Sequence, residues 1–438
     1  MSPEIENTAF VVNLNNGNVN NNNQNNNNYV RAVSDCHHET NDAIDLASLY
    51  RGYLDCRRNK ARTLSVSEFE VEQEHQLIEL LNEIEHRAYA PLPAKAFVIT
   101  KPDYREIFAS AFRDRVVQHW MRLYLEPMLE EQLATSVFSC RKGKGTFAAQ
   151  QYVAQMIHDV SEGYTRDCWA MKLDLKGFYM SIDRRLVTDR ALCFVGDGNS
   201  ALRYLLVVML GRSPEVDCIR CGDTSLWQFL PSHKSLFTCG EGKGLTIGDV
   251  LIQHIANLLL DPIDHYIKGV LGLGYARYVD DMVIVGNDKK YMLSCVPLIR
   301  QMLATEAGLT LHPRKFYLQH YTKGVKFVGA VIKPGRTYIS NRTVNSAFGR
   351  IRGFNAIRSD RLRRRNVDRL VASVNSYLGI MRHHASCNIR QRLIAAIDDG
   401  WRKYITIADD YTKINVRKQY SRREQIRRLV KSKLIWKH

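Results

Sequence analysis

Apolar positions in the first hundred residues repeat with the period of an α-helix. Residues 42 to 90 therefore read as helical, with a second apolar stripe between residues 70 and 89. Pro91 and Pro93 then end the helical pattern. The first stripe consists of Ala43, Leu46, Leu49, Tyr50 and Tyr53.

Between residues 96 and 340 the pattern changes to short apolar runs that predict strands, and two of these runs carry acidic residues. The run 168–173 leads directly into Asp174, and Asp280 and Asp281 stand before the apolar run 282–285. The second arrangement predicts a hairpin with an acidic tip. Carboxylates beside a core are costly unless they are paired. Two magnesium ions held by carboxylates from separate strands would pair them, as in phosphoryl transfer. The alternative is that these Asp residues only cap turns.

The last hundred residues are basic and contain no proline. From Asn341 onward there are 24 Lys and Arg against 7 Asp and Glu, so this part carries the whole net charge of +17. Leu370, Val374, Tyr377 and Leu378 keep a helical period within it. A basic helical segment suits binding to a phosphate backbone. A merely solvated basic face is the alternative.

Composition divides the chain into four expected parts and limits the classes of protein to which it can belong. Twelve of the sixteen residues from Asn13 to Asn28 are Asn, which predicts disorder for the N-terminus. No apolar run reaches the ~18 residues of a membrane span. Ten scattered Cys suit a reducing cytoplasm. The Cys218/Cys221 pair, with Cys239 downstream, lacks a convincing fourth zinc ligand. The expected parts are a low-complexity N-terminus (1–33), a helical extension (34–95), a catalytic region (96–340) and a basic helical region (341–438).

The acidic motifs resemble those of reverse transcriptases. Tyr278-Val279-Asp280-Asp281 is similar to the Tyr-x-Asp-Asp box of the palm, and the segment 174–183 is similar to the first palm motif. The resemblance implies an α+β right-hand polymerase with fingers, a palm built on an antiparallel sheet, and a helical thumb. It implies an RNA-directed DNA polymerase with two Mg²⁺ ions. The implied metal residues are Asp174, Leu175, Asp280 and Asp281, of which the three Asp are catalytic.

Further motifs in the same order imply residues that contact the nucleotide. Segments 105–118 and 136–146 resemble the fingers motifs, and the second is a glycine-containing cationic loop that suits a triphosphate. Tyr179 occupies the position of the family's steric gate against a ribose 2′-hydroxyl. The segment 243–257 resembles the palm motif that supports template and nucleotide, where glycines let the backbone approach a base pair, and 323–332 resembles the primer-grip hairpin. The nucleotide-binding candidates are Arg105, Arg141, Lys144, Tyr179, Gly248, Gln253 and Lys315, with Lys315 as an acid toward pyrophosphate.

Two features resemble the reverse transcriptases of diversity-generating retroelements. The first is Ile247-Gly248 followed by Gln253, although Ile252 and Thr246 depart from the subgroup's Ser and Pro. The second is the Asn-rich stretch 9–33, which resembles a translated template repeat. The subgroup implies error-prone copying at template adenines. Its partners would be template RNA, cDNA or primer, and a small helical accessory protein on the basic surface. A retron, group II intron or phage-defence enzyme without adenine bias is one alternative, and a degenerate polymerase that only holds RNA is another.

Overall fold

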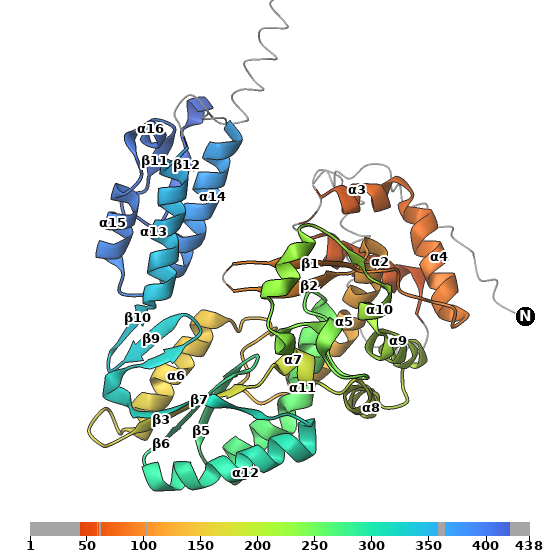
Figure 1. Ribbon diagram of the computed structural model, residues 1–438, viewed down its shortest axis with the longest axis horizontal. Helices are drawn as coiled ribbons and strands as arrows, with labels where there is room; N and C mark the ends of the chain where they lie inside the picture. Colours follow the sequence, from red (N-terminus) through yellow and green to blue (C-terminus); the bar gives the residue numbers. More distant parts are fainter. Residues whose placement is uncertain (1–43, 59, 61–62, 102, 358–363, 421–438) are drawn as a thin grey trace, which may run out of the picture. The chain divides into compact units, whose positions relative to one another are not determined.

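The computed structural model describes residues 44–58, 60, 63–101, 103–357 and 364–420, and these fall into two compact units (Figure 1). The Asn-rich segment 1–33, the arginine run at 361–363 and the arginines beyond residue 420 lie outside the described residues. The first unit comprises residues 1–133, 176–261 and 303–309, and the second comprises 134–175, 262–302 and 310–438. The division into four sequence parts stays a prediction.

The first unit contains the N-terminal helices that the apolar stripes predict. Its other helices and strands come from later parts of the chain. Its helices and strands, taken together, are α2 Leu46–Arg57, α3 Leu64–Val71, α4 Gln73–Glu85, β1 Lys95–Ile99, β2 Arg105–Ala109, α5 Phe112–Gln132, α7 Phe178–Ser181, α8 Arg184–Val195, α9 Ser200–Gly211, α10 Pro214–Asp217, β4 Ile219–Arg220 and the start of α11 Val250–His265. Three 3-10 turns follow β4, namely η1 Thr224–Phe229, η2 Ser232–Lys234 and η3 Leu236–Thr238.

Helix α2 begins at a capping box and packs tightly on α5. The Asp45 side chain accepts a hydrogen bond from the Ser48 backbone N–H, and the Ser48 hydroxyl accepts one from the Asp45 N–H. A side chain at Gly52 would meet the Trp120 Cβ at 2.9 Å, so glycine permits the close approach. Helix α4 ends at Glu85, earlier than the prolines suggest, and Tyr89 is instead buried beyond it.

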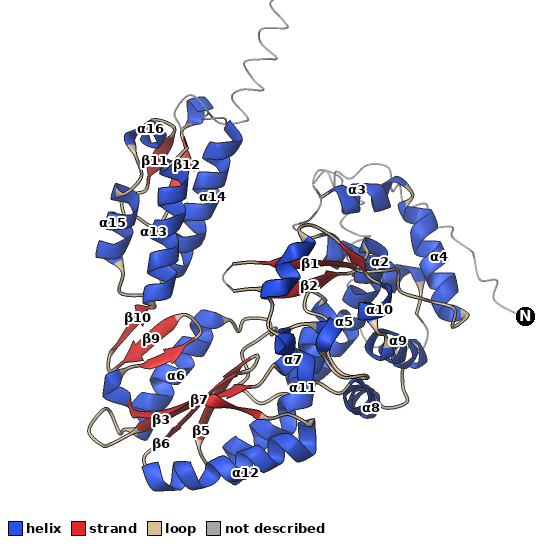
Figure 2. Ribbon diagram, viewed as in Figure 1, coloured by secondary structure: helices blue, strands red, loops and turns tan. Residues whose placement is uncertain are grey.

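The second unit is built on a four-stranded antiparallel sheet in the order β5-β6-β3-β7 (Figure 2). Helix α6 covers one face, where Val153, Met156 and Ile157 pack on Ala170 and Val283. The strands on either side of β3, namely β6 and β7, both come from much later in the chain. The elements are α6 Thr146–Val160, β3 Trp169–Leu175, the π-helical turn η4 Tyr266–Val270, β5 Gly274–Tyr278, β6 Asp281–Gly286, α12 Lys289–Ala307, β7 Leu311–His320 and η5 Tyr321–Lys323.

The chain then forms a three-stranded sheet. The mainly helical region after it, described over residues 341–357 and 364–420, is called the thumb. In the thumb, the predicted apolar positions Leu370, Val374 and Leu378 are buried, with Tyr377 packed against the same core. A short hairpin of β11 and β12 also belongs to this core, and the helical pattern did not predict it. The elements are β8 Val325–Phe327, β9 Ala330–Lys333, β10 Arg336–Ile339, α13 Asn341–Asn355, α14 Arg364–Met381, α15 Cys387–Ala395, α16 Asp399–Arg402, β11 Ile405–Ile407, β12 Ile414–Val416 and the turn η7 Lys418–Tyr420.

Candidate active site

The three candidate carboxylates lie at one end of the sheet of the second unit. Asp174 is the penultimate residue of β3, Asp281 is the first residue of β6, and Asp280 stands in the turn before it. Strands β3 and β6 are antiparallel neighbours with Leu173 opposite Met282. This register brings Asp174 and Asp281 next to each other across the two strands. The predicted hairpin with an acidic tip is confirmed.

Two lysines pair with these carboxylates. The Nζ atom of Lys172 lies 2.6 Å from Asp281 Oδ1 and donates to Oδ2 at 2.8 Å. The Nζ atom of Lys315, in β7, donates to Asp174 Oδ2 at 2.6 Å. Lys172 is not among the residues predicted from the sequence motifs. Its signal was a lysine inside an apolar strand, two residues before Asp174 and therefore on the same face of β3.

The environment of Asp281 favours a cation. Burial raises the pKa of Asp281 above its ordinary value, the nearby Asp174 carboxylate adds to this, and Lys172 acts in the opposite direction. Oδ1 of Asp281 is buried, and the group beside it is the Lys172 ammonium at 2.6 Å. A buried carboxylate oxygen that already faces a positive charge is a suitable ligand for a hard cation.

The described residues contain no group of three His, Cys, Asp or Glu side chains spaced to hold a metal ion. The three candidate carboxylates are therefore not gathered into a ready ligand set, and the two lysines hold Asp174 and Asp281 instead. The available donors nevertheless fit magnesium, because this ion prefers oxygen ligands. The site offers carboxylate oxygens and a backbone carbonyl such as that of Leu175.

The turn that carries Asp280 has a strained backbone. Val279 has a φ of 58°, which is an outlier for a β-branched residue. Its N–H donates to Ser139 Oγ at 3.1 Å, and its carbonyl accepts from Arg277 Nη1 at 3.0 Å. Strain of this kind costs about 1–3 kcal/mol and persists only where the surroundings fix it. Contacts on both sides of Val279 fix this turn.

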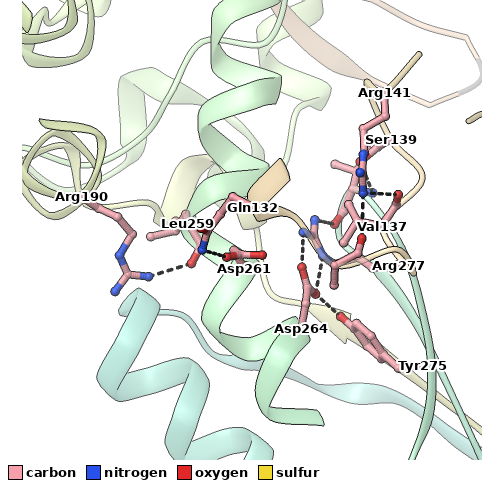
Figure 3. A network of polar contacts seen from close by, with 12 residues as sticks. Gln132, Val137, Ser139, Arg141, Arg190, Leu259, Asp261, Asp264, Tyr275 and Arg277 are labelled. Carbon is pink, nitrogen blue, oxygen red and sulfur yellow. Dashed lines mark hydrogen bonds and ion pairs between the residues drawn. The ribbon is translucent and has the colours of Figure 1, made fainter. Parts of the chain in front are cut away.

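A buried ion pair supports the hairpin from within the sheet (Figure 3). Arg277 in β5 is 1% exposed and bonds Asp264 through Nε at 2.8 Å and Nη2 at 2.5 Å. The Tyr275 hydroxyl donates to the same carboxylate at 2.6 Å, and burial raises the pKa of Tyr275 well above its ordinary value. A bidentate, fully hydrogen-bonded pair is the form in which a buried charge is tolerated. Arg277 thereby connects α11 to the turn that carries Asp280.

Two cationic side chains of the loop at residues 141–144 donate hydrogen bonds to backbone carbonyls. Arg141 is 8% exposed, and its Nη1 donates to the carbonyls of Ala134 and Val137, so the guanidinium faces into the protein (Figure 3). The Lys144 Nζ donates to the Thr135 carbonyl at 2.9 Å. Lys142 between them is exposed. Arg141 thus holds the loop in shape, and its contact with a triphosphate stays a prediction.

The other nucleotide-binding candidates belong to the first unit. Arg105 is exposed at the start of β2, and Gln253 is exposed on α11. Tyr179 is half-buried, and its carbonyl accepts from the Leu245 N–H at 2.9 Å. Their contact with a nucleotide stays a prediction.

Gly248 makes its close approach within the first unit. It has a φ of 139°, and a Cβ there would lie 2.5 Å from the Phe108 carbonyl oxygen. The expected approach was to a base pair. In the structure, glycine is required because the backbone of β2 lies against this loop. The neighbouring Ile247 carbonyl accepts from the Phe108 N–H at 3.0 Å.

A protein-family model matches more than half of the chain. The family model described as reverse transcriptase (RNA-dependent DNA polymerase) matches residues 99–332. The chain is 22% identical over 297 residues to Protein YkfC of Escherichia coli strain K12, covering 59% of this chain and 71% of that protein.

Two solved telomerase structures are also similar. One is telomerase from Candida albicans with a fragment of telomeric RNA, at 11% identity and a TM-score of 0.41, covering 72% of this chain. The other is apo telomerase from Candida tropicalis, truncated from its C-terminal domain, at 12% identity and a TM-score of 0.41, covering 60% of this chain. The chain spans 55% and 59% of those two chains. No helix within the described ranges has the length and apolar character to cross a membrane.

Proposed function

This chain belongs to the reverse transcriptase family of RNA-dependent DNA polymerases, and from that premise we propose that Asp174, Asp280 and Asp281 carry out its nucleotidyl transfer. The observation that carries the proposal is the register of β3 and β6, which sets Asp174 beside Asp281 with Asp280 in the adjoining turn. Asp174 and Asp281, more than a hundred positions apart in the chain, thereby lie next to each other.

Magnesium ions held by these carboxylates and the Leu175 carbonyl would lower the pKa of the primer 3′-hydroxyl and neutralise charge on the leaving pyrophosphate. Lys172 and Lys315 pair with Asp281 and Asp174 before substrate arrives. Lys315 is 62% exposed, so it is free to swing to pyrophosphate and donate a proton there. This role for Lys315 is part of the proposal.

The proposed substrate is a template-repeat RNA, copied into cDNA with errors concentrated at template adenines. The Asn-rich stretch 9–33, together with Ile247, Gly248 and Gln253, supports this subgroup. Ile252 is 4% exposed, so the residue that replaces the subgroup's Ser contributes to packing under the nucleotide-binding motif. A small helical accessory protein bound to the basic thumb is the proposed partner.

Primer extension on an RNA template with Mg²⁺ and four deoxynucleotides tests the catalytic assignment. We expect Asp281→Asn to lower the rate on the order of a thousandfold, because the transition state loses several kcal/mol of charge stabilisation. Asp197→Asn is the matched control, since Asp197 is 99% exposed and lies in the other unit. Equal rates for the two variants would refute the site.

Sequencing the products of the same reaction tests the subgroup. Errors concentrated opposite template adenine would support the diversity-generating assignment. Errors spread evenly over the four template bases would place the enzyme among retron, group II intron or phage-defence types. A wild-type protein that binds RNA but extends no primer, even with a candidate accessory protein, would favour the RNA-holding alternative.

A further inference from the structure

One carboxylate of the first unit is fully buried among apolar side chains. Glu106 in β2 is 0% exposed and lies on the same face of the strand as Phe108, since residues two apart on a strand share a face. Phe108 belongs to a buried apolar cluster with Ala94 and Ala96. A carboxylate in such a place is costly unless hydrogen-bond donors satisfy it.

The donors to Glu106 come from residues 223–239, which contain the turns η1, η2 and η3 and which we call the turn segment. Oε1 of Glu106 accepts from Trp227 Nε1 at 2.6 Å and from Ser235 Oγ at 2.9 Å. Oε2 accepts from the Leu236 N–H at 2.6 Å. Donors from η1 and η3 thereby converge on one carboxylate, which fixes how the turn segment folds against β2.

The side chain of Leu236 continues the contact toward helix α7. A Cβ at Gly244 would overlap Leu236 Cδ1, so glycine lets the backbone lie directly against this side chain. The Gly244 N–H donates to the Ile182 carbonyl at 2.8 Å, and the Leu245 N–H donates to the Tyr179 carbonyl at 2.9 Å. Leu236 therefore packs on the short stretch of backbone that holds Tyr179 in place.

Tyr179 also meets the turn segment at two other points. Two residues before it, a Cβ at Gly177 would lie 2.8 Å from the His233 carbonyl oxygen. The Tyr179 side chain packs against the buried cluster that includes Met180 and Leu236. The position of Tyr179 thus depends on the turn segment through its backbone and through its side chain.

We propose that Glu106 is a positioning residue that sets the Tyr179 ring through the turn segment and thereby determines discrimination between deoxynucleotides and ribonucleotides. The inference rests on the proposed function and on the predicted role of Tyr179 as a steric gate against a ribose 2′-hydroxyl. A contact of this kind has to be held to within about 0.5 Å by the residues behind it. The hydrogen bonds to Glu106 provide that support without contact to the nucleotide.

The test is Glu106→Gln in the full-length protein. The amide has the size of the carboxylate but carries one donor group, so its NH2 faces the N–H of either Trp227 or Leu236. One buried donor then loses its acceptor. We expect the ratio of kcat/KM for a deoxynucleotide to that for the matching ribonucleotide to fall about tenfold, mainly because ribonucleotide addition becomes faster. Partial unfolding would lower both rates alike and leave the ratio unchanged. Glu74→Gln, at an exposed position of α4, is the matched control and should keep the wild-type ratio.

Removing the indole donor as well provides a rescue. In the double variant Glu106→Gln with Trp227→Phe, the amide oxygen can accept from the Leu236 N–H while its NH2 donates to Ser235 Oγ, so every partner is matched. The ratio should return to within about twofold of that of Trp227→Phe alone. An unchanged ratio in Glu106→Gln would overturn the proposal, and so would a double variant that discriminates as poorly as Glu106→Gln.

Hydrogen–deuterium exchange without nucleotide separates the positioning role from catalysis. Glu106→Gln should speed exchange of the Leu236 amide and, beyond the turn segment, of the Gly244 and Leu245 amides. Faster exchange confined to the turn segment would overturn the proposal, because the displacement would not reach Tyr179. If wild type extends no primer, the proposed function fails, and if Tyr179→Val keeps the wild-type ratio, the steric gate fails. In both cases, exchange at Gly244 and Leu245 still decides whether Glu106 positions Tyr179.

Discussion

At the scale of single residues, lysines balance the negative charge of the carboxylates proposed to be catalytic. Lys172 and Asp281 are 24% and 26% exposed, so their pair is partly screened by solvent. A pair of this kind contributes about 1 kcal/mol. A divalent cation bound by Asp281 would have to displace Lys172 from this carboxylate. Lys172 would therefore compete with the metal for Asp281.

Lys172→Met is expected to lower the Mg²⁺ concentration for half-maximal primer extension about fivefold, the equivalent of about 1 kcal/mol. The assay should be run near pH 8, because removing the lysine also raises the pKa of Asp281 and protonation would mask the gain. Lys289→Met serves as the control on an exposed lysine. A higher Mg²⁺ requirement in Lys172→Met would show that the lysine orients Asp281 instead of competing with the metal.

Residue types and spacing were enough to predict the acidic hairpin, but they could not show which cations lie beside it. The pairing of Lys172 with Asp281 can be recognised only once two facts are known. Side chains of β3 alternate between the two faces of the sheet, and β3 pairs with β6. Arg141 shows a second limit of prediction from sequence, because a motif does not reveal where its side chains point. A glycine-rich basic loop is typical of phosphate contact, yet three-dimensional packing turns this guanidinium toward the carbonyls of Ala134 and Val137.

At the scale of elements, Asp114 connects helix α5 to the segment before β1. It is fully buried, and it accepts from the Tyr89 hydroxyl at 2.9 Å and the Leu92 N–H at 3.0 Å. Burial raises the pKa of Asp114 to about 6, and the hydrogen bonds and Arg113 offset only part of this. The folded protein therefore binds this proton more tightly than the unfolded chain does.

This raised pKa predicts a pH-dependent stability. Between pH 4 and pH 6 the folded state holds more protons at Asp114 than the unfolded state, so its contribution to stability is present at low pH and is lost as the pH rises through about 6. The free energy of unfolding of wild type relative to Asp114→Asn should fall on the order of 3 kcal/mol over this window. Urea unfolding followed by tryptophan fluorescence measures it. Curves that stay parallel from pH 4 to pH 7 would contradict the assignment.

Apolar periodicity predicted the N-terminal and C-terminal helices because each has one face on a core, and short apolar runs predicted the hairpin with the acidic tip. The antiparallel sheet was expected from the resemblance to reverse transcriptases. It did not predict the hairpin of β11 and β12, since Ile405–Ile407 and Ile414–Val416 are too short to show alternation. It also placed the end of the helix before Pro91 too late. Tyr89 continues the apolar pattern, but the chain uses it beyond α4 to reach Asp114.

At the scale of the whole molecule, net charge is confined to the C-terminal quarter of the sequence. Within the described part of it, Arg365 and Arg369 are exposed on α14. Each phosphate neutralised by such a side chain adds about one to the slope of binding against salt on logarithmic axes. The thumb is therefore expected to account for most of the salt dependence of binding.

Replacing Arg365 and Arg369 by Gln should make the dependence of log K on log salt concentration shallower by about two for an RNA–DNA duplex. Lys289→Gln with Lys290→Gln is the charge-matched control, because these exposed lysines lie at the start of α12. Fluorescence anisotropy at several salt concentrations gives both slopes. An unchanged slope in the Arg variant would mean that this basic face is merely solvated.

The position of β3 between β6 and β7 has a consequence for synthesis on the ribosome. Asp174 emerges long before either neighbouring strand exists, since its partner Lys315 lies 141 residues further along the chain. At roughly 10 residues per second, β3 waits on the order of ten seconds with both edges unpaired. Unpaired strand edges recruit other strands and promote aggregation. Translation speed and chaperone supply should therefore limit the yield of active enzyme more than its final stability does.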